Sequence, residues 1–286
     1  MHINLFPIAR PESMGISSKQ ILKFLEKAED NGIMLHSVLM MRKGHVVAEG
    51  YYAPFTKDSL HRIYSVSKTF VSTAIGLLAD EGRISLDDKA CSYFRDKLPD
   101  NPHPWILDMT IHDLLIMATP HVTPTYKPED KDWAWTSFNT EPSHPPGTVF
   151  NYDTSGTYIL NVLVERVTGK PFLEYMKDKM LRELGFSEEA WCIKAPEGNS
   201  WGGSGVICTT RDIARLALVY MNNGRIGGKQ YLSEEYVKAA TSRQIDNMTS
   251  GHRDYMHGNG YGYQIWMLKD GAYAFVGMGM QLAICI

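Results

Sequence analysis

Strand-like sequence lies at both ends of this chain, and helical sequence lies between them. Lys43-Gly44 and Asp270-Gly271 separate strand-like runs and are dipeptides that favour the tight turns of hairpins. The expected strands are residues 36–42, 45–52, 261–269, 272–281 and 282–286. A fold with strands at both ends of the chain needs long-range pairing, and the helices in the middle must pack against the resulting sheet.

The first helix of the middle region is the most apolar one. In residues 65–82, Phe70, Ala74, Leu77 and Leu78 recur at helical spacing. Because this helix is apolar nearly all round, we expect it to be buried. Capping residues, helix-ending glycines and periodicity predict further helices at residues 17–29, 111–118, 155–168, 171–184 and 210–223.

These patterns predict an α+β fold, in which an antiparallel sheet is built from the N- and C-terminal strands and is flanked by helices. Residues 1–286 are expected to form one domain. Its sheet subdomain would comprise about 1–64 and 225–286, and a mainly helical subdomain would be inserted at about 65–224. Residues 119–150 are rich in Pro, Trp and polar residues, which indicates a long loop that walls a cleft.

Composition excludes several classes of protein. The 286 residues include 29 basic and 32 acidic side chains, a net charge of −3, so we expect no nucleic-acid partner. Apolar stretches are interrupted well before the roughly 18 residues that a membrane span needs. The first thirty residues lack the pattern of a signal peptide, so we expect a cytoplasmic protein. The four cysteines lie far apart, and the ten histidines, including His252 and His257, show no ligand spacing, so we expect neither a metal nor another cofactor.

The candidate catalytic residues are Ser65 and Lys68, which form the single Ser-x-x-Lys of the chain. Residues three apart on a helix share a face, so the Lys68 amine can reach the Ser65 hydroxyl. The positive end of the helix dipole would also favour an oxyanion there. To act as a base near neutral pH, Lys68 needs its pKa lowered by about three units from about 10.4, which burial can supply. A second hydroxyl that relays the proton must come from distant sequence, and Tyr152 is our candidate.

Each of these residues also has a structural interpretation. Ser65 can cap the helix, Lys68 can be a solvated surface lysine, and Tyr152 can be one of 15 tyrosines whose rings only pack. The motif alone does not decide between these readings, because such a spacing arises by chance about once in a chain of this length.

A longer series of motifs is more specific, and through it the chain resembles the serine β-lactamase and penicillin-binding protein superfamily. The resemblance is to its branch of class C β-lactamases, esterases and 6-aminohexanoate-dimer hydrolases. The motifs that carry it cover nearly the whole chain, in the order HSVLMMRKGHVVAEGYY, HRIYSVSKTFVSTAIGLLADEGRISLDD, MTIHDLL, PPGTVFNYDTSGTYILNVLVERVTGKP, GGSGVICTTRDIARLALVYMNNGRIGG, YGYQIW and AFVGMGMQ.

The resemblance implies a role for particular residues. Ser65 would be the acylated nucleophile, Lys68 its activating partner, and Tyr152 the tyrosine of the family's Tyr-x-Asn motif. The family's third motif, a triplet that ends in Gly on an edge strand, falls on a run that ends at Gly277. The backbone N–H of Met278 would then join that of Ser65 in an oxyanion hole.

The chain also departs from the family pattern. Thr154 replaces the Asn of the second motif, and Phe275 and Val276 replace the charged and hydroxyl members of the third. The side chains that usually hold a β-lactam carboxylate are therefore absent. The expected activity is hydrolysis of uncharged esters or amides through an acyl-enzyme on Ser65, with a small molecule as substrate. A true class C-type β-lactamase or D-alanyl peptidase, and a catalytically weak binding or sensor protein of the same fold, remain as alternatives.

The end of the chain is a further departure. Members of this family normally continue past the strand that holds the third motif with at least one more strand and a closing helix. This sequence stops at Ile286. An unpaired sheet edge is a site of strand addition, so we expect marginal stability, self-association through the C-terminal edge or a truncated gene product.

Overall fold

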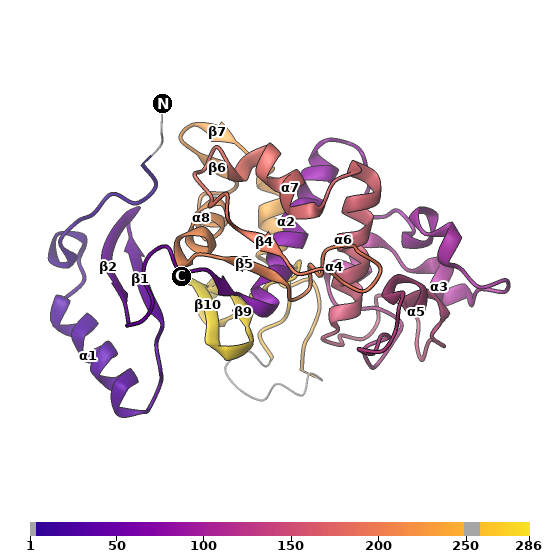
Figure 1. Ribbon diagram of the computed structural model, residues 1–286, viewed down its shortest axis with the longest axis horizontal. Coiled ribbons are helices and arrows are strands. Elements are labelled where there is room, and N and C mark those ends of the chain that lie inside the picture. The colour runs from indigo at the N-terminus through magenta and orange to yellow at the C-terminus, as the bar shows by residue number, and fades with distance from the viewer. Residues whose placement is uncertain (1–3, 249–257) are drawn as a thin grey trace.

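The computed structural model describes residues 4–248 and 258–286 of the chain, and it confirms the α+β class (Figure 1). His252 and His257, which the sequence analysis considered as metal ligands, lie outside the described residues. The α-helices are α1 (Ser18–Asp30), α2 (Ser67–Asp80), α3 (Pro104–Asp108), α4 (Ile111–Leu115), α5 (Trp133–Asn139), α6 (Thr154–Thr168), α7 (Phe172–Met176), α8 (Thr210–Met221) and α9 (Glu234–Ala240). The strands are β1 (Ser37–Arg42), β2 (His45–Tyr51), β3 (His61–Arg62), β4 (Trp191–Cys192), β5 (Val206–Cys208), β6 (Arg225–Ile226), β7 (Lys229–Gln230), β8 (Trp266–Met267), β9 (Tyr273–Gly277) and β10 (Gln281–Cys285).

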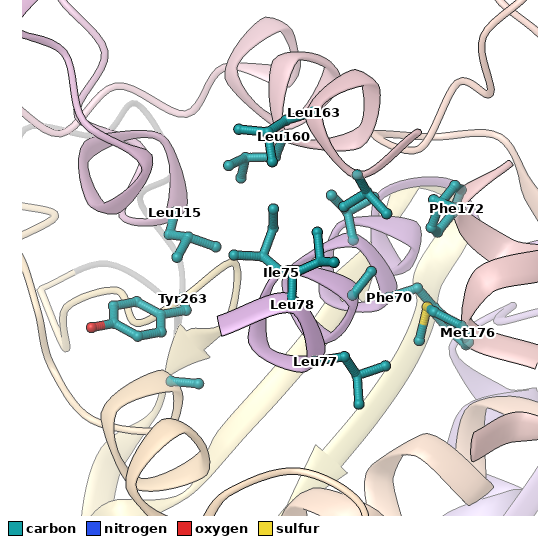
Figure 2. Packing of buried hydrophobic residues seen from close by; sticks show 14 of the residues in the cluster. Phe70, Ile75, Leu77, Leu78, Leu115, Leu160, Leu163, Phe172, Met176 and Tyr263 are labelled. Atoms are coloured by element: carbon teal, nitrogen blue, oxygen red, sulfur yellow. The ribbon is translucent and has the colours of Figure 1, made fainter. Parts of the chain in front are cut away.

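The apolar helix of the sequence analysis is α2, and it runs through the main hydrophobic core, as expected. Every residue from Ser67 to Leu78 is buried. Figure 2 shows side chains of α2 facing side chains of α6, of α7 and of the segments around residues 115 and 263. Burial of each large apolar side chain contributes about 1.5–3 kcal/mol, so the core holds this helix firmly in place. The residues at its N-terminal end are therefore held on a rigid support.

The N-terminal strands form the expected hairpin. β1 and β2 pair antiparallel, with Val38 opposite Gly50. Lys43 (φ 50°) and Gly44 (φ 75°) both adopt the left-handed region, as the two central residues of a type I′ turn do.

The prediction of a strand at 261–269 is wrong over most of that range, since only Trp266–Met267 forms a strand, β8. Gln264 interrupts the extended run with a φ of 60°. Its buried side chain donates to the carbonyl oxygens of Leu114 and Leu115 and accepts from the Thr157 hydroxyl. These hydrogen bonds fasten residue 264 to two helices instead of to a neighbouring strand.

The strands from the two ends of the chain belong to separate sheets, which the sequence analysis expected to be one. β1 and β2 form one sheet, and β10, β9 and β8 form another in that order. The hairpin is attached to α8 by side chains instead: the guanidinium of Arg211 binds the carboxylate of Glu49, and the hydroxyls of Ser37 and Thr210 lie 2.7 Å apart. A third sheet, β3-β5-β4, includes two strands from the range that was expected to be helical.

The other predicted helices agree with the structure to different degrees. α8 lies where a helix was expected, and Thr209 and Asp212 form a capping box at its start. The expected helix at 171–184 is split into α7 and a π-helical turn at Lys177–Leu181. The expected loop at 119–150 contains α5, and α9 was not predicted. Within residues 4–248 and 258–286, no helix combines the length and apolar character needed to cross a bilayer, and no group of three or more potential ligands is arranged to hold a metal.

Candidate active site

Ser65 lies at the corner where β3 leads into α2. A 3₁₀ turn, Tyr64–Val66, connects the two elements. Tyr64 has a φ of 46°, which is unfavourable for an aromatic residue and costs on the order of 1 kcal/mol or more. This strained residue directly precedes Ser65, and the Ser65 side chain remains partly exposed. Ser67, by contrast, accepts a hydrogen bond from the buried Val206 N–H and faces away from the site.

Lys68 is buried at the start of α2, with 1% of its surface exposed. Its Nζ donates to the Ser65 Oγ (3.1 Å), to the Thr154 Oγ1 (3.0 Å) and to the Gly203 carbonyl oxygen (2.6 Å). Burial lowers the pKa of Lys68 to about 7, while the nearby Asp153 carboxylate acts in the opposite direction. An amine with this pKa is present in both protonation states at neutral pH.

Tyr152 lies beside this pair, although it comes from a distant part of the sequence. Its ring centroid is 5.2 Å from the Lys68 Nζ. Burial raises the pKa of Tyr152 to about 12, and a hydrogen bond with Ser65 acts in the opposite direction. The ring packs against Trp266 at a centroid distance of 5.2 Å. The structure thus brings Ser65, Lys68 and Tyr152 together.

Two residues that follow Tyr152 complete this side of the site. Thr154, the first residue of α6, accepts from Lys68 through its hydroxyl. Asp153 is the N-cap of α6, and its Oδ1 accepts from the Ser155 N–H at 2.8 Å. Burial raises the pKa of Asp153 to about 6, and its Oδ2 makes no hydrogen bond within the described residues. The sequence analysis missed Asp153, although an Asp directly before Thr-Ser is a recognisable helix-start signal.

Gly277 brings the end of β9 against the corner that carries Ser65. A Cβ atom at this position would lie 2.4 Å from the Ile63 carbonyl oxygen and 3.2 Å from the Val66 nitrogen. The close approach therefore requires glycine. Met278 is the next residue, and its side chain is 73% exposed. Its backbone and that of Ser65 thus belong to segments that touch each other.

Gly203 supplies the shortest hydrogen bond of Lys68 and was also missed. A Cβ atom at Gly203 would lie 2.5 Å from the Thr154 Cγ2, so a larger residue would push this loop away from α6. The run Gly202-Gly203 was visible in the sequence as a place where the backbone can approach closely. Its acceptor is a backbone carbonyl, however, which no residue type identifies.

Comparison with known proteins assigns the family. The family model described as Beta-lactamase matches residues 26–284. The chain belongs to the β-lactamase family. It is therefore a member of a hydrolase family with the β-lactamase fold, as its motifs indicated.

Individual relatives are more distant. The chain is 28% identical over 241 residues to a 6-aminohexanoate-dimer hydrolase of Paenarthrobacter ureafaciens, a match that covers 78% of this chain and 59% of the relative. The octameric penicillin-binding protein homologue from Pyrococcus abyssi superposes with a TM-score of 0.70 at 21% identity, covering 93% of this chain and 69% of that one. EstCE1, a hydrolase with promiscuous acyltransferase activity, superposes with a TM-score of 0.71 at 16% identity, covering 96% and 92%. The two structural matches establish the fold.

Proposed function

We propose that the protein is a serine hydrolase that cleaves ester or amide bonds through an acyl-enzyme on Ser65. The observation that carries this proposal is the placement of Lys68, whose Nζ lies 3.1 Å from the Ser65 Oγ and whose pKa is about 7. A general base is most effective when its pKa lies near the working pH, and an ordinary lysine is three units too basic.

Protons would move between Ser65, Lys68 and Tyr152 as the bonds change. The Ser65 Oγ bonds to the carbonyl carbon, and neutral Lys68 takes the hydroxyl proton. Tyr152, whose pKa is about 12, is a neutral phenol at pH 7 and relays this proton to the leaving oxygen or nitrogen as its bond to carbon breaks. Water then attacks the acyl-enzyme with the same groups in reverse, which releases the acid and restores the Ser65 hydroxyl.

The oxyanion of each tetrahedral intermediate would accept hydrogen bonds from the backbone N–H groups of Ser65 and Met278. The contact between Gly277 and the backbone at Ile63 and Val66 supports this assignment. A donor of this kind contributes about 3–4 kcal/mol to the stability of the transition state.

The third motif argues against efficient hydrolysis of β-lactams. Phe275 is fully buried in the core, and Val276 has no polar group. Neither side chain can bind a carboxylate from this strand. Esters and linear amides therefore fit better, and the names of two relatives, a 6-aminohexanoate-dimer hydrolase and a D-stereospecific amidohydrolase, agree with amide substrates.

The proposal is tested by intact-protein mass and turnover with a nitrophenyl ester, a linear amide and a penicillin. We expect a transient acyl adduct on the wild type and none on Ser65→Ala, with turnover of the ester or amide reduced about 1,000-fold or more. Tyr152→Phe should also lose most of its turnover, whereas Tyr52→Phe, a change on a tyrosine that is 42% exposed, should not.

The alternatives give different results in the same experiment. Absence of both adduct and turnover would support a binding protein of the same fold. Rapid hydrolysis of a chromogenic cephalosporin would support a true β-lactamase. Wild-type turnover by Ser65→Ala or Tyr152→Phe would show that these residues have been assigned wrongly.

A further inference from the structure

Arg62, on β3, has a guanidinium group without an acidic partner. Within residues 4–248 and 258–286 it makes no ion pair. Its Cζ lies 4.7 Å from the ring centroid of Tyr64 and 4.8 Å from that of Trp201, so the cation packs on two aromatic rings. Stacking of this kind fixes the plane of the guanidinium and leaves its edge available for hydrogen bonds.

The guanidinium of Arg62 and the amine of Lys68, the candidate base, donate to the same loop. Arg62 Nε donates to the Ser204 carbonyl oxygen at 3.0 Å, and Lys68 Nζ donates to the preceding carbonyl oxygen, that of Gly203, at 2.6 Å. Arg62 also precedes Ser65 by three residues, so their Cα atoms are at most about 11 Å apart. The side chains of Arg62, Tyr64, Trp201 and Ser204 are all partly exposed, so a small molecule can reach them.

Three acidic groups belong to the segment before Trp201, to the helix that it contacts or to the surroundings of Lys68, and each carboxylate binds other groups through at least one oxygen. Glu165 on α6 accepts from Asn199 and from the Ser200 N–H. Glu197 accepts from the N–H groups at the start of α5. Asp153 is buried and caps α6. Among the described residues, Arg62 therefore has no acidic partner, and it lies against the loop that also contacts Lys68.

We propose that Arg62 binds a carboxylate of the substrate, so that the preferred substrates are esters or amides with a carboxylate a few bonds from the scissile carbonyl, a conclusion that rests on the proposed function. Nε and a longer 3.4 Å contact from Nη2 to the Ser204 Oγ hold one side of the guanidinium. The other N–H groups have the fork geometry that carboxylates accept. The expectation of uncharged substrates rests on the third motif, which lies on β9 and not on the strand that carries Arg62.

The test compares substrates that differ in one charge. Kinetics of 4-nitrophenyl hexanoate are measured beside those of the 4-nitrophenyl half-ester of adipic acid, which has the same acyl length and ends in a carboxylate. A third substrate, 3-carboxy-4-nitrophenyl hexanoate, carries the carboxylate on the leaving group. Each is assayed with wild type, Arg62→Gln, Arg62→Lys and the control Arg225→Gln, whose guanidinium is exposed and donates to the Gly228 carbonyl oxygen. The readout is the ratio of kcat/KM between substrates within each protein, corrected for spontaneous hydrolysis.

We expect wild type and Arg225→Gln to prefer one of the carboxylate substrates about tenfold, mainly through KM, because a charge-assisted hydrogen bond is stronger than one between neutral groups. The preferred substrate shows which side of the scissile bond faces Arg62. Arg62→Gln should abolish the preference, and Arg62→Lys should retain part of it because it keeps the charge without the fork.

Two further results separate this inference from the proposed function. Ser65-dependent hydrolysis of 4-nitrophenyl hexanoate without any preference for a carboxylate, or with a preference that Arg62→Gln retains, would overturn the role of Arg62 and leave the hydrolase intact. No hydrolysis of any substrate would overturn both. If Arg62→Gln does not fold, inhibition of the wild type decides: adipate should compete with the neutral ester more strongly than hexanamide, and equal inhibition would contradict the proposal.

Discussion

At the scale of single residues, the proposed chemistry depends most on the charge of Lys68. Burial lowers its pKa to about 7, and the Asp153 carboxylate raises it. The two effects compete at one nitrogen, and desolvation is the larger. Asp153 thus lies next to the proposed catalytic residues, the described residues show no direct hydrogen bond from it to Lys68, and it would influence the reaction by its charge.

Asp153→Asn tests this influence. The asparagine Oδ1 can still accept from the Ser155 N–H, so the cap of α6 is retained. Loss of the carboxylate removes an effect that raises the pKa of Lys68, so this pKa should fall. Because the neutral amine is the proposed general base, the acid limb of the profile of kcat/KM against pH should move to lower pH, on the order of one unit.

The control for this prediction is Asp132→Asn. Asp132 caps α5 in the same way, by accepting from the Trp135 N–H. This substitution also removes a carboxylate from a helix cap, but Asp132 is not among the groups that shift the pKa of Lys68, so the acid limb should stay in place. An unchanged limb in Asp153→Asn, or a movement to higher pH, would contradict the proposed electrostatic role.

The sequence predicts the residues of the candidate site unevenly. Ser65 and Lys68 share a helix start, so their spacing is visible in the sequence, and Tyr152 becomes visible through the motifs of the family. Arg62 and Asp153 were not singled out, because their roles depend on what lies beside them after folding. The Arg62 guanidinium packs on Tyr64 and on the distant Trp201. Asp153 acts on Lys68, which also comes from a distant segment.

At the scale of elements, the site depends on the contact between the end of β9 and the β3–α2 corner. The space at Gly277 is too small for any side chain, since a Cβ atom would lie 2.4 Å from the Ile63 carbonyl oxygen. Both partners at this contact are backbone groups, which cannot move aside by a change of rotamer. Any larger residue must shift the strand or the corner.

Gly277→Ala should therefore reduce kcat by about 100-fold or more, because Met278 would no longer be placed to donate to the oxyanion. Overpacking should lower the free energy of unfolding by only about 1–3 kcal/mol. Gly50→Ala is the matched control, since Gly50 also lies in a strand and a Cβ atom there meets nothing within 4 Å. Steady-state kinetics and urea unfolding of both variants check the prediction. Full activity of Gly277→Ala would exclude Met278 from the oxyanion hole.

Long elements were predicted better than short ones. α2, α6 and the β1–β2 hairpin have strong periodicity or turn chemistry, and they lie where expected. The two-residue strands β3 and β4 have no such pattern and exist because β5 lies between them. The run at 261–269 had strand composition, but the buried hydrogen bonds of Gln264 outweighed it. Tertiary contacts decide such segments, and a single sequence does not show them.

At the scale of the whole molecule, one central helix supports the proposed site while the sheets remain small. α2 is surrounded by α6, α7 and the C-terminal segments, which makes the core continuous around the residues that follow Ser65 (Figures 1 and 2). The sheet of β8, β9 and β10 ends at β10, and within the described residues no further strand pairs with the other edge of β10. A rigid centre is thus combined with an open strand edge.

This edge leads us to expect that the 286-residue chain self-associates as its concentration rises. Ile284 on β10 is 53% exposed, and exposed apolar edge strands pair with other chains. Ile284→Lys places a charge on the edge and should shift the population towards monomer, as measured by light scattering after size exclusion at several concentrations.

Leu22→Lys makes the same kind of change on α1, where Leu22 is 58% exposed, and should leave the association unchanged. A wild type that stays monomeric throughout, or equal dissociation by both variants, would show that β10 is not the contact. Because Ile284 is not among the proposed catalytic residues, comparison of turnover in the two variants would also show whether association affects the site.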